Sequence, residues 1–209
     1  MPYEEINDDI NHILHAIGHG HVTEYDWLIQ NIRQVAEAEY QRKYKNFWRL
    51  NGAGLSQPYC HAYFQHLQTG LDNNPPHLIL LAKKLYQIPI NTKNIKALEF
   101  SFCTKLCHML NHELPIYDSK IKLFYDFNEP PRTLPIIDRL RGYAQSYRFL
   151  IDEYNRVLNE GLLLPSIQAF RRHFNPKHFT DKKIIDSLIW GFQNIKKRSG
   201  MNRRIRDCQ

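Results

Sequence analysis

The sequence contains little glycine and no long hydrophobic run. Nine glycines among 209 residues provide little material for the tight turns of a β protein. No stretch approaches the length of about 18 apolar residues that marks a membrane-spanning helix. Residues 1–5 do not begin a basic segment followed by an apolar one, as a secretory signal would. These absences predict a soluble, cytoplasmic protein with no membrane partner.

Cysteines are few, and the local signatures of many enzyme classes are missing. The four thiols lie at Cys60, Cys103, Cys107 and Cys208, a scatter that is typical of reduced, buried cysteines rather than of a disulfide framework. The sequence has no phosphate-binding glycine loop, no His-Glu-x-x-His helix, no Gly-x-Ser-x-Gly elbow and no paired zinc knuckle. It therefore calls for no cofactor and no metal.

What the sequence has in quantity is hydrophobic and aromatic residues at helical spacing. Hydrophobic residues make up 43% of the chain, with 12 Tyr and 11 Phe, and no convincing alternating strand interrupts them. We predict an all-α fold of about nine helices in one compact domain or two closely packed lobes, over residues 1–195. A stiff loop at 127–134 is the candidate lobe boundary, and residues 196–209 form a basic tail. The expected helices span 6–17, 23–48, 58–70, 77–87, 98–110, 119–125, 135–160, 165–175 and 180–195.

Several of these helices have recognisable ends. Gly18 and Gly20 are expected to end the first helix, and Thr23-Glu-Tyr-Asp26 is similar to a capping box that opens the second. Ser56-Gln-Pro58 opens the third. The apolar run at 77–87 is expected at the centre of the core.

The stretch from Leu98 to Ile121 is the most informative part of the chain. Apolar residues recur at helical spacing up to Leu110, which places Lys105 and His108 on or beside the border of the buried face. After a turn, Pro115-Ile-Tyr-Asp118 precedes another short helix, and Asp118 is a strong candidate for its N-cap.

The net charge of +7 favours a polyanionic partner, because neutralising phosphates releases counterions. Aromatic and basic residues alternate from Arg42 to Arg49, a mixture that suits stacking on bases but equally suits a buried aromatic face with basic stems reaching water. A solvated tail is the corresponding alternative for the basic end. The candidate nucleic-acid contacts are Lys120, Arg171, Arg172, Lys196, Lys197, Arg198, Arg203 and Arg204.

Histidines at His12, His15, His19 and His21 have spacings at which two of them can share a metal. No acidic or cysteine ligand lies nearby in the sequence to complete such a site. The alternative interpretation is a polar helix border followed by a turn.

Lys105 and Asp118 are the candidate catalytic residues. If their helices pack as a corner, the two side chains meet in one cleft that Tyr117, Lys120 and His108 would help to line. A lysine removed from water there has a lowered pKa and can act as an amine nucleophile, while a carboxylate stabilises developing positive charge. The alternative interpretation is an exposed helix lysine and an ordinary N-cap.

Ser101-Phe-Cys-Thr-Lys105, followed by a helix and Leu114-Pro-Ile-Tyr-Asp118-Ser-Lys-Ile121, resembles the helix-hairpin-helix DNA glycosylase superfamily. In that comparison Ser101 and Cys103 stand at the hairpin glycines. The resemblance implies that Lys105 corresponds to the Schiff-base lysine of the bifunctional members and Asp118 to the catalytic aspartate. It further implies a DNA partner and excision of a flipped base in DNA repair, by an active or a degenerate member.

A second hypothesis comes from another functional class. In this interpretation the chain is a non-enzymatic helical interaction protein, such as a small bacterial defence or regulatory component. Residues 115–118 then form a structural corner, and the basic tail is solvated or binds RNA or an acidic protein.

Overall fold

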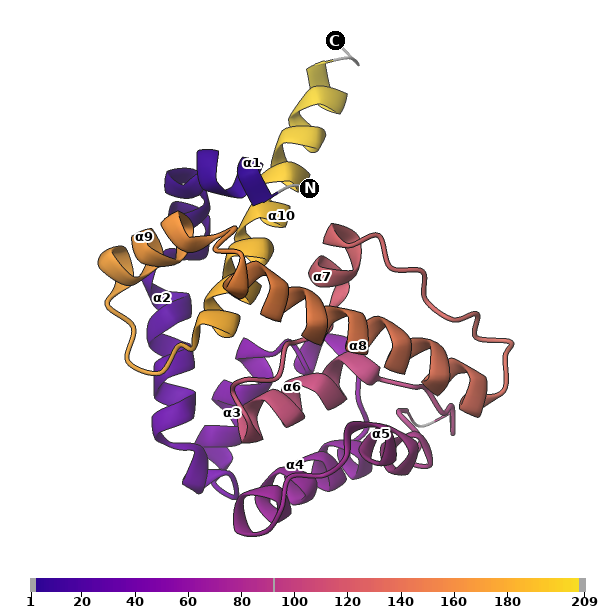
Figure 1. The fold of residues 1–209 in the computed structure, drawn as a ribbon. Helices are drawn as coiled ribbons and strands as arrows, with labels where there is room; N and C mark the ends of the chain where they lie inside the picture. The colour runs from indigo at the N-terminus through magenta and orange to yellow at the C-terminus, as the bar shows by residue number, and fades with distance from the viewer. Residues whose placement is uncertain (1–2, 92, 207–209) are drawn as a thin grey trace.

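The computed structural model describes the backbone of residues 3–91 and 93–206 and the side chains as far as Lys197 (Figure 1). Within these ranges the fold is all-α, with ten α-helices, two short 3-10 helices and no strand, which confirms the predicted class. The helices are α1 (Tyr3–Asp8), α2 (Ile10–Gln30), α3 (Ala38–Phe47), α4 (Gln57–Asp72), α5 (Leu78–Tyr86), α6 (Phe100–Leu110), α7 (Ser119–Phe124), α8 (Ile136–Asn159), α9 (Leu164–Phe174) and α10 (Asp181–Arg206). None of the helices in the described ranges is both long enough and apolar enough to cross a membrane.

The N-terminal helices agree with the prediction only in part. Gly18 adopts φ 73° and ψ 152°, a non-helical conformation that glycine reaches without steric cost, so the first helical segment of α2 ends there, as predicted, and a kink separates it from the second. The helix that was expected over 23–48 is two helices, and Thr23 lies inside α2. The proposed capping box is wrong, because the Asp26 carboxylate accepts the backbone N–H groups of Lys177 and His178 instead.

Two predicted N-caps are confirmed. The Ser56 hydroxyl accepts a hydrogen bond from the Tyr59 amide at the start of α4, over 3.2 Å. Asp118 Oδ1 accepts the amides of Lys120 and Ile121 over 2.8 and 3.1 Å and so begins α7. The Asp118 carboxylate is thereby fixed in direction by two backbone donors.

Helix α10 is the central element of one half of the molecule. It packs against α2, α7, α8 and α9, and in Figure 1 its C-terminal turns project beyond the body of the protein. The helix continues through Arg206, so the segment that was predicted as a basic tail begins inside a helix. The α10 side chains that are at most 2% exposed are those of Ile184, Ile185, Leu188, Ile189, Phe192, Lys183 and Ser187.

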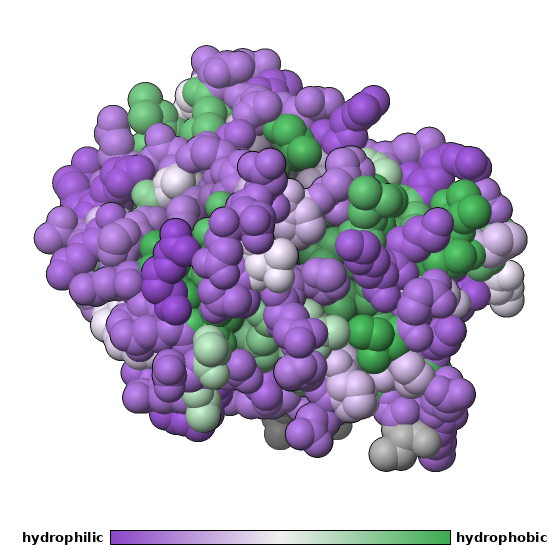
Figure 2. Space-filling view, turned by 90° about the horizontal axis from the view of Figure 1, so that it is seen from below, coloured by the Kyte–Doolittle hydropathy of each residue, from purple (hydrophilic) through white to green (hydrophobic). Residues whose placement is uncertain are grey.

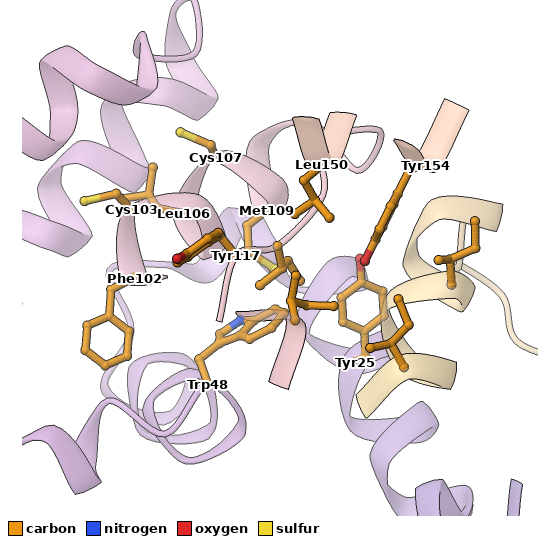
Figure 3. Close-up of a cluster of buried hydrophobic side chains, with 14 of the residues drawn as sticks. Tyr25, Trp48, Phe102, Cys103, Leu106, Cys107, Met109, Tyr117, Leu150 and Tyr154 are labelled. Atoms are coloured by element: carbon orange, nitrogen blue, oxygen red, sulfur yellow. The ribbon is translucent and has the colours of Figure 1, made fainter. Parts of the chain in front are cut away.

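Helix α6 lies between this half and the α4–α5 pair, and it is buried on every side from Phe102 to Met109. Lys105 and His108 are therefore inside the protein rather than on a border. Figure 3 shows Phe102 and Trp48 within the same buried cluster. Helix α5 is less central than predicted, because Leu80 is 58% exposed.

The cysteines of α6 are free thiols in this core. Cys103 and Cys107 are buried, and burial raises the pKa of the Cys107 thiol to about 12. Cys60 is a half-buried free thiol, while Cys208 lies outside the described residues. Burial raises the pKa of Cys60, Cys103 and Cys107 and so favours their neutral, weakly nucleophilic form.

The outer surface is largely polar. On the face shown in Figure 2, hydrophilic residues predominate and hydrophobic side chains come to the surface among them in several places. The most exposed large apolar side chains of the described residues include Leu123, Ile137 and Leu164.

Candidate functional site

The candidate site is a cavity of about 510 Å³. Its walls come from α2, from the end of α3, from α6, from the residue that precedes α7, and from α10. The lining residues are His21, Glu24, Asn46, Phe47, Trp48, Arg49, Lys105, Asp118, Lys183, Asp186, Ser187 and Trp190.

Lys105 projects from the buried helix α6 and is 8% exposed. Its Nζ donates a hydrogen bond to the carbonyl oxygen of Trp48 over 3.2 Å, and lies 5.0 Å from the centre of the Phe102 ring. Burial lowers the pKa of Lys105, and the nearby carboxylates of Asp118 and Asp186 oppose that shift. The environment thus favours the neutral amine more than water does.

Asp118 lines the same cavity from the turn that begins α7, and its side chain is half-buried. Of the charged groups around Lys105, its carboxylate has the largest effect on the lysine pKa. Both hydrogen bonds that it accepts from described residues go to Oδ1. The two predicted catalytic residues, thirteen positions apart on different elements, therefore face one cavity.

A buried ion pair that was not predicted from the sequence lines the same cavity. Lys183 Nζ lies 2.7 Å from Asp186 Oδ2 on α10, and the two residues are 2% and 7% exposed. The Lys183 ammonium also lies 5.4 Å from the Trp48 ring. Burial raises the pKa of Asp186, and pairing with Lys183 opposes the shift. The sequence contains an indication of this pair, because Lys183 and Asp186 interrupt a helical segment that is otherwise mostly apolar.

Three stacked rings form another part of the wall. The His21 ring lies between those of Phe47 and Trp190, at centroid distances of 4.8 and 5.2 Å and interplanar angles of 26° and 11°. Burial, with smaller effects from Lys183 and Arg49, lowers the pKa of His21 to about 3. At neutral pH the imidazole is therefore an uncharged aromatic ring.

The three residues predicted as neighbours in the cleft are not part of its lining. His108 is buried and donates Nδ1–H to the Leu114 carbonyl, while the Tyr25 hydroxyl donates to its Nε2 over 2.7 Å. Tyr117 is 3% exposed. Lys120 is half-buried on α7, and burial together with the charge of Lys197 lowers its pKa.

The predicted phosphate contacts lie in different surroundings. Arg171 pairs with Asp181 over 2.7 Å, and Lys196 pairs with Glu5 over 2.8 Å. Arg172 and Lys197 are exposed. The side chains of Arg198, Arg203 and Arg204 lie outside the described residues.

The N-terminal histidines do not converge. The His19 ring packs against His173 and Phe174, whereas His21 belongs to the stack described above. Over the part of the chain that the structure describes, no three His, Cys, Asp or Glu side chains are arranged to hold a metal ion.

The chain matches no protein-family model, no curated protein and no solved structure. Ser101 and Cys103, the residues aligned with hairpin glycines, are helical and belong to α6. Lys105 and Asp118, the residues to which the resemblance assigns catalysis, both line the cavity.

Proposed function

We propose that this chain is a DNA-binding protein of the base-excision glycosylase type. The observation that carries the proposal is the meeting of Lys105 and Asp118 at one cavity of about 510 Å³, beside the aromatic side chains of Trp48, Phe47 and Trp190. Aromatic faces hold a flipped base, while a lysine and a carboxylate suit cleavage of the bond between base and sugar.

In this proposal Lys105 is the nucleophile. Burial lowers its pKa and so favours the neutral amine, whose lone pair would form a bond to C1′ of the deoxyribose. The bond from C1′ to the base breaks, and the base leaves with the electron pair and takes up a proton. The amine nitrogen then loses a proton, and the sugar ring opens as the C1′–O4′ bond breaks and O4′ takes up the electron pair and a proton, which leaves a protonated Schiff base between Lys105 and C1′.

Asp118 stabilises the positive charge that develops on the sugar as the base leaves. Its direction is set by the two amides at the start of α7, so the carboxylate needs little reorganisation during the reaction. The second carboxylate oxygen is the one available to the substrate, since Oδ1 carries both hydrogen bonds.

Basic side chains near the cavity would hold the phosphate backbone. Arg49 lines the cavity, is exposed, and adopts φ 62°, an uncommon conformation for a residue with a side chain. Lys120 and Lys197 lie close enough for their charges to interact. Such contacts predict that DNA affinity falls steeply with added salt.

Base release from duplexes that carry damaged bases tests this function. Asp118→Asn is expected to abolish release while leaving DNA affinity nearly unchanged, because asparagine keeps the helix cap but not the charge. The matched control is Asp152→Asn, an exposed position on α8. Unchanged release by Asp118→Asn would refute the assignment.

The interaction-protein alternative has one observation in its favour. Apolar side chains are exposed on α7 and α8, where Leu123 is 63%, Ile137 60% and Phe149 45% exposed. Exposed apolar groups of this kind are common at protein interfaces. A titration with salt separates the two functions, since DNA affinity that does not weaken as salt is added favours the alternative.

A further inference from the structure

The buried pair of Lys183 and Asp186 has no part in the reaction proposed above, although both residues line the cavity. Lys183 Nζ donates to Asp186 Oδ2 over 2.7 Å, and it lies 5.4 Å from the centre of the Trp48 ring. Lys105 Nζ lies 5.8 Å from the centre of the same ring. Burying a charged pair costs free energy, and buried ionisable groups with shifted pKa values cluster at functional sites.

The two oxygens of the Asp186 carboxylate differ in their surroundings. Oδ2 accepts from Lys183, whereas Oδ1 accepts from no described residue. Oδ1 is not one of the unpaired polar atoms that are shut off from solvent, and the side chain keeps 10% of its surface exposed. Because Asp186 lines the cavity, the accessible surface of this oxygen faces it. The ion pair therefore fixes one oxygen and leaves the other able to exchange a proton with a group in the cavity.

The proposed reaction needs a group that takes up protons and returns them. Starting from the ammonium form, the nitrogen of Lys105 gives up two protons before the Schiff base is complete. The base that leaves takes up one proton, and O4′ of the opened sugar takes up the other. The protons balance without an outside acid or base when one side chain in the cavity carries each of them in turn.

Asp186 suits this role better than the other two carboxylates of the lining, Glu24 and Asp118. Of the three, Asp118 and Asp186 are the ones whose charges affect the pKa of Lys105. Asp118 accepts two backbone amides and is assigned to the positive charge on the sugar. Burial raises the pKa of Asp186, which makes its carboxylate a stronger base than a carboxylate in water.

We propose that Asp186 is a second catalytic carboxylate, which shuttles protons from Lys105 to the departing base and to O4′, and that Lys183 positions it. This inference rests on the proposed function and assigns a further catalytic residue to it. Asp186 Oδ1 accepts a proton from the Lys105 ammonium, directly or through one water. The N–H bond breaks, its electron pair stays on nitrogen, and an O–H bond forms on Asp186.

The carboxylic acid formed in this step gives its proton to the departing base, which restores the Asp186 carboxylate. After the bond to C1′ has formed, the same oxygen takes the second proton from the Lys105 nitrogen. It passes that proton to O4′ as the sugar ring opens. Lys183 stays an ammonium throughout and keeps its hydrogen bond to Oδ2.

The test measures the rate of borohydride-trapped adduct formation in single turnovers, and DNA affinity, with the full chain and duplexes that carry damaged bases or an abasic site. Asp186→Ala removes the carboxylate and leaves room for formate. The double variant Lys183→Met with Asp186→Leu leaves no unpaired buried charge, so it carries the test where Asp186→Ala does not fold. The matched control is Asp181→Ala, an exposed aspartate on the same helix.

Both variants are expected to form the adduct at least about a hundredfold more slowly than the wild type, and to bind DNA within about twofold of it. Formate should restore the rate of Asp186→Ala, because it supplies the missing carboxylate. It should not restore the double variant, in which leucine fills the space. Asp181→Ala should match the wild type.

The outcomes separate the inference from the function on which it rests. A wild-type rate in either folded variant would overturn the proton shuttle and leave the proposed function standing. A loss of rate in folded Asp186→Ala that formate does not repair would overturn it as well. Neither adduct nor base release with the wild-type protein would overturn the proposed function, and the shuttle with it.

Discussion

The Nζ of Lys105 donates a hydrogen bond to the main-chain carbonyl of Trp48, a residue 57 positions earlier in the chain, over 3.2 Å. This contact connects α6 to the residue that ends α3. It holds a buried amine at the wall of the cavity that Asp118 also lines. The reactivity of that amine is the property on which the functional account depends.

The lowered pKa of Lys105 predicts unusual reactivity toward small acylating reagents. Because burial disfavours the ammonium form, the neutral amine appears at lower pH in the folded protein than in the unfolded chain. Acetic anhydride labelling across a pH series, read by mass spectrometry of the Lys105 peptide, measures the midpoint. A midpoint in native protein at or above that in urea-unfolded protein would contradict the prediction.

The cap at Asp118 predicts a stability effect separate from catalysis. Asp118→Ala removes the acceptor for the Lys120 and Ile121 amides and should lower the free energy of unfolding by about 1 kcal/mol. Asp118→Asn retains an acceptor and should cost less. Urea unfolding of both variants checks the order, and equal losses would show that the cap is not the source of the effect.

The buried pair of Lys183 and Asp186 predicts strong non-additivity. Lys183→Met leaves an uncompensated buried carboxylate and should destabilise the protein by about 3–5 kcal/mol. The double variant Lys183→Met with Asp186→Leu removes both charges, and should be closer to the wild type. Thermal unfolding of the two variants provides the comparison; a double variant less stable than the single one would argue against a coupled pair.

His21 predicts a loss of stability in acid. Its folded-state pKa of about 3 lies below the ordinary value of 6.5. Between these values the unfolded chain binds the proton and the folded chain does not, so stability falls as the pH is lowered from 6.5 toward 3. His21→Phe keeps an aromatic ring in the stack and should flatten this part of the curve. Parallel unfolding curves for variant and wild type across that range would refute the shift.

Local patterns in the sequence were sufficient to predict the fold class and several helix ends. The helical spacing around 98–110, the proline after Ser56 and the carboxylate at Asp118 each act within a few residues, and the structure has a helix or cap at each. The pattern from Thr23 to Asp26 is also local, but the capping box that it predicts does not form. The Asp26 carboxylate instead accepts a hydrogen bond from a loop more than 150 residues away. A local sequence motif does not show which hydrogen-bond donors from distant parts of the chain will contact its side chains.

The site could be predicted only in part. Asp118 stands out because it follows Pro115 at a predicted N-cap, and Lys105 stands out through its place in the glycosylase-like pattern. Lys183 and Asp186 lie in an apolar helix, and their burial becomes evident only when α10 packs against α2, α7, α8 and α9. The stack of His21 on Phe47 and Trp190 joins three separate helices, and no spacing within the sequence records it.

Borohydride trapping tests the central claim most directly. Purified protein is incubated with duplexes that carry damaged bases or an abasic site, with Lys105→Ala, Asp118→Asn and the exposed control Lys83→Ala measured alongside. The account predicts a covalent protein–DNA adduct that survives in Lys83→Ala and is lost in Lys105→Ala. An adduct that persists in Lys105→Ala, or no adduct on any of these duplexes, would contradict the assignment of Lys105 as the nucleophile.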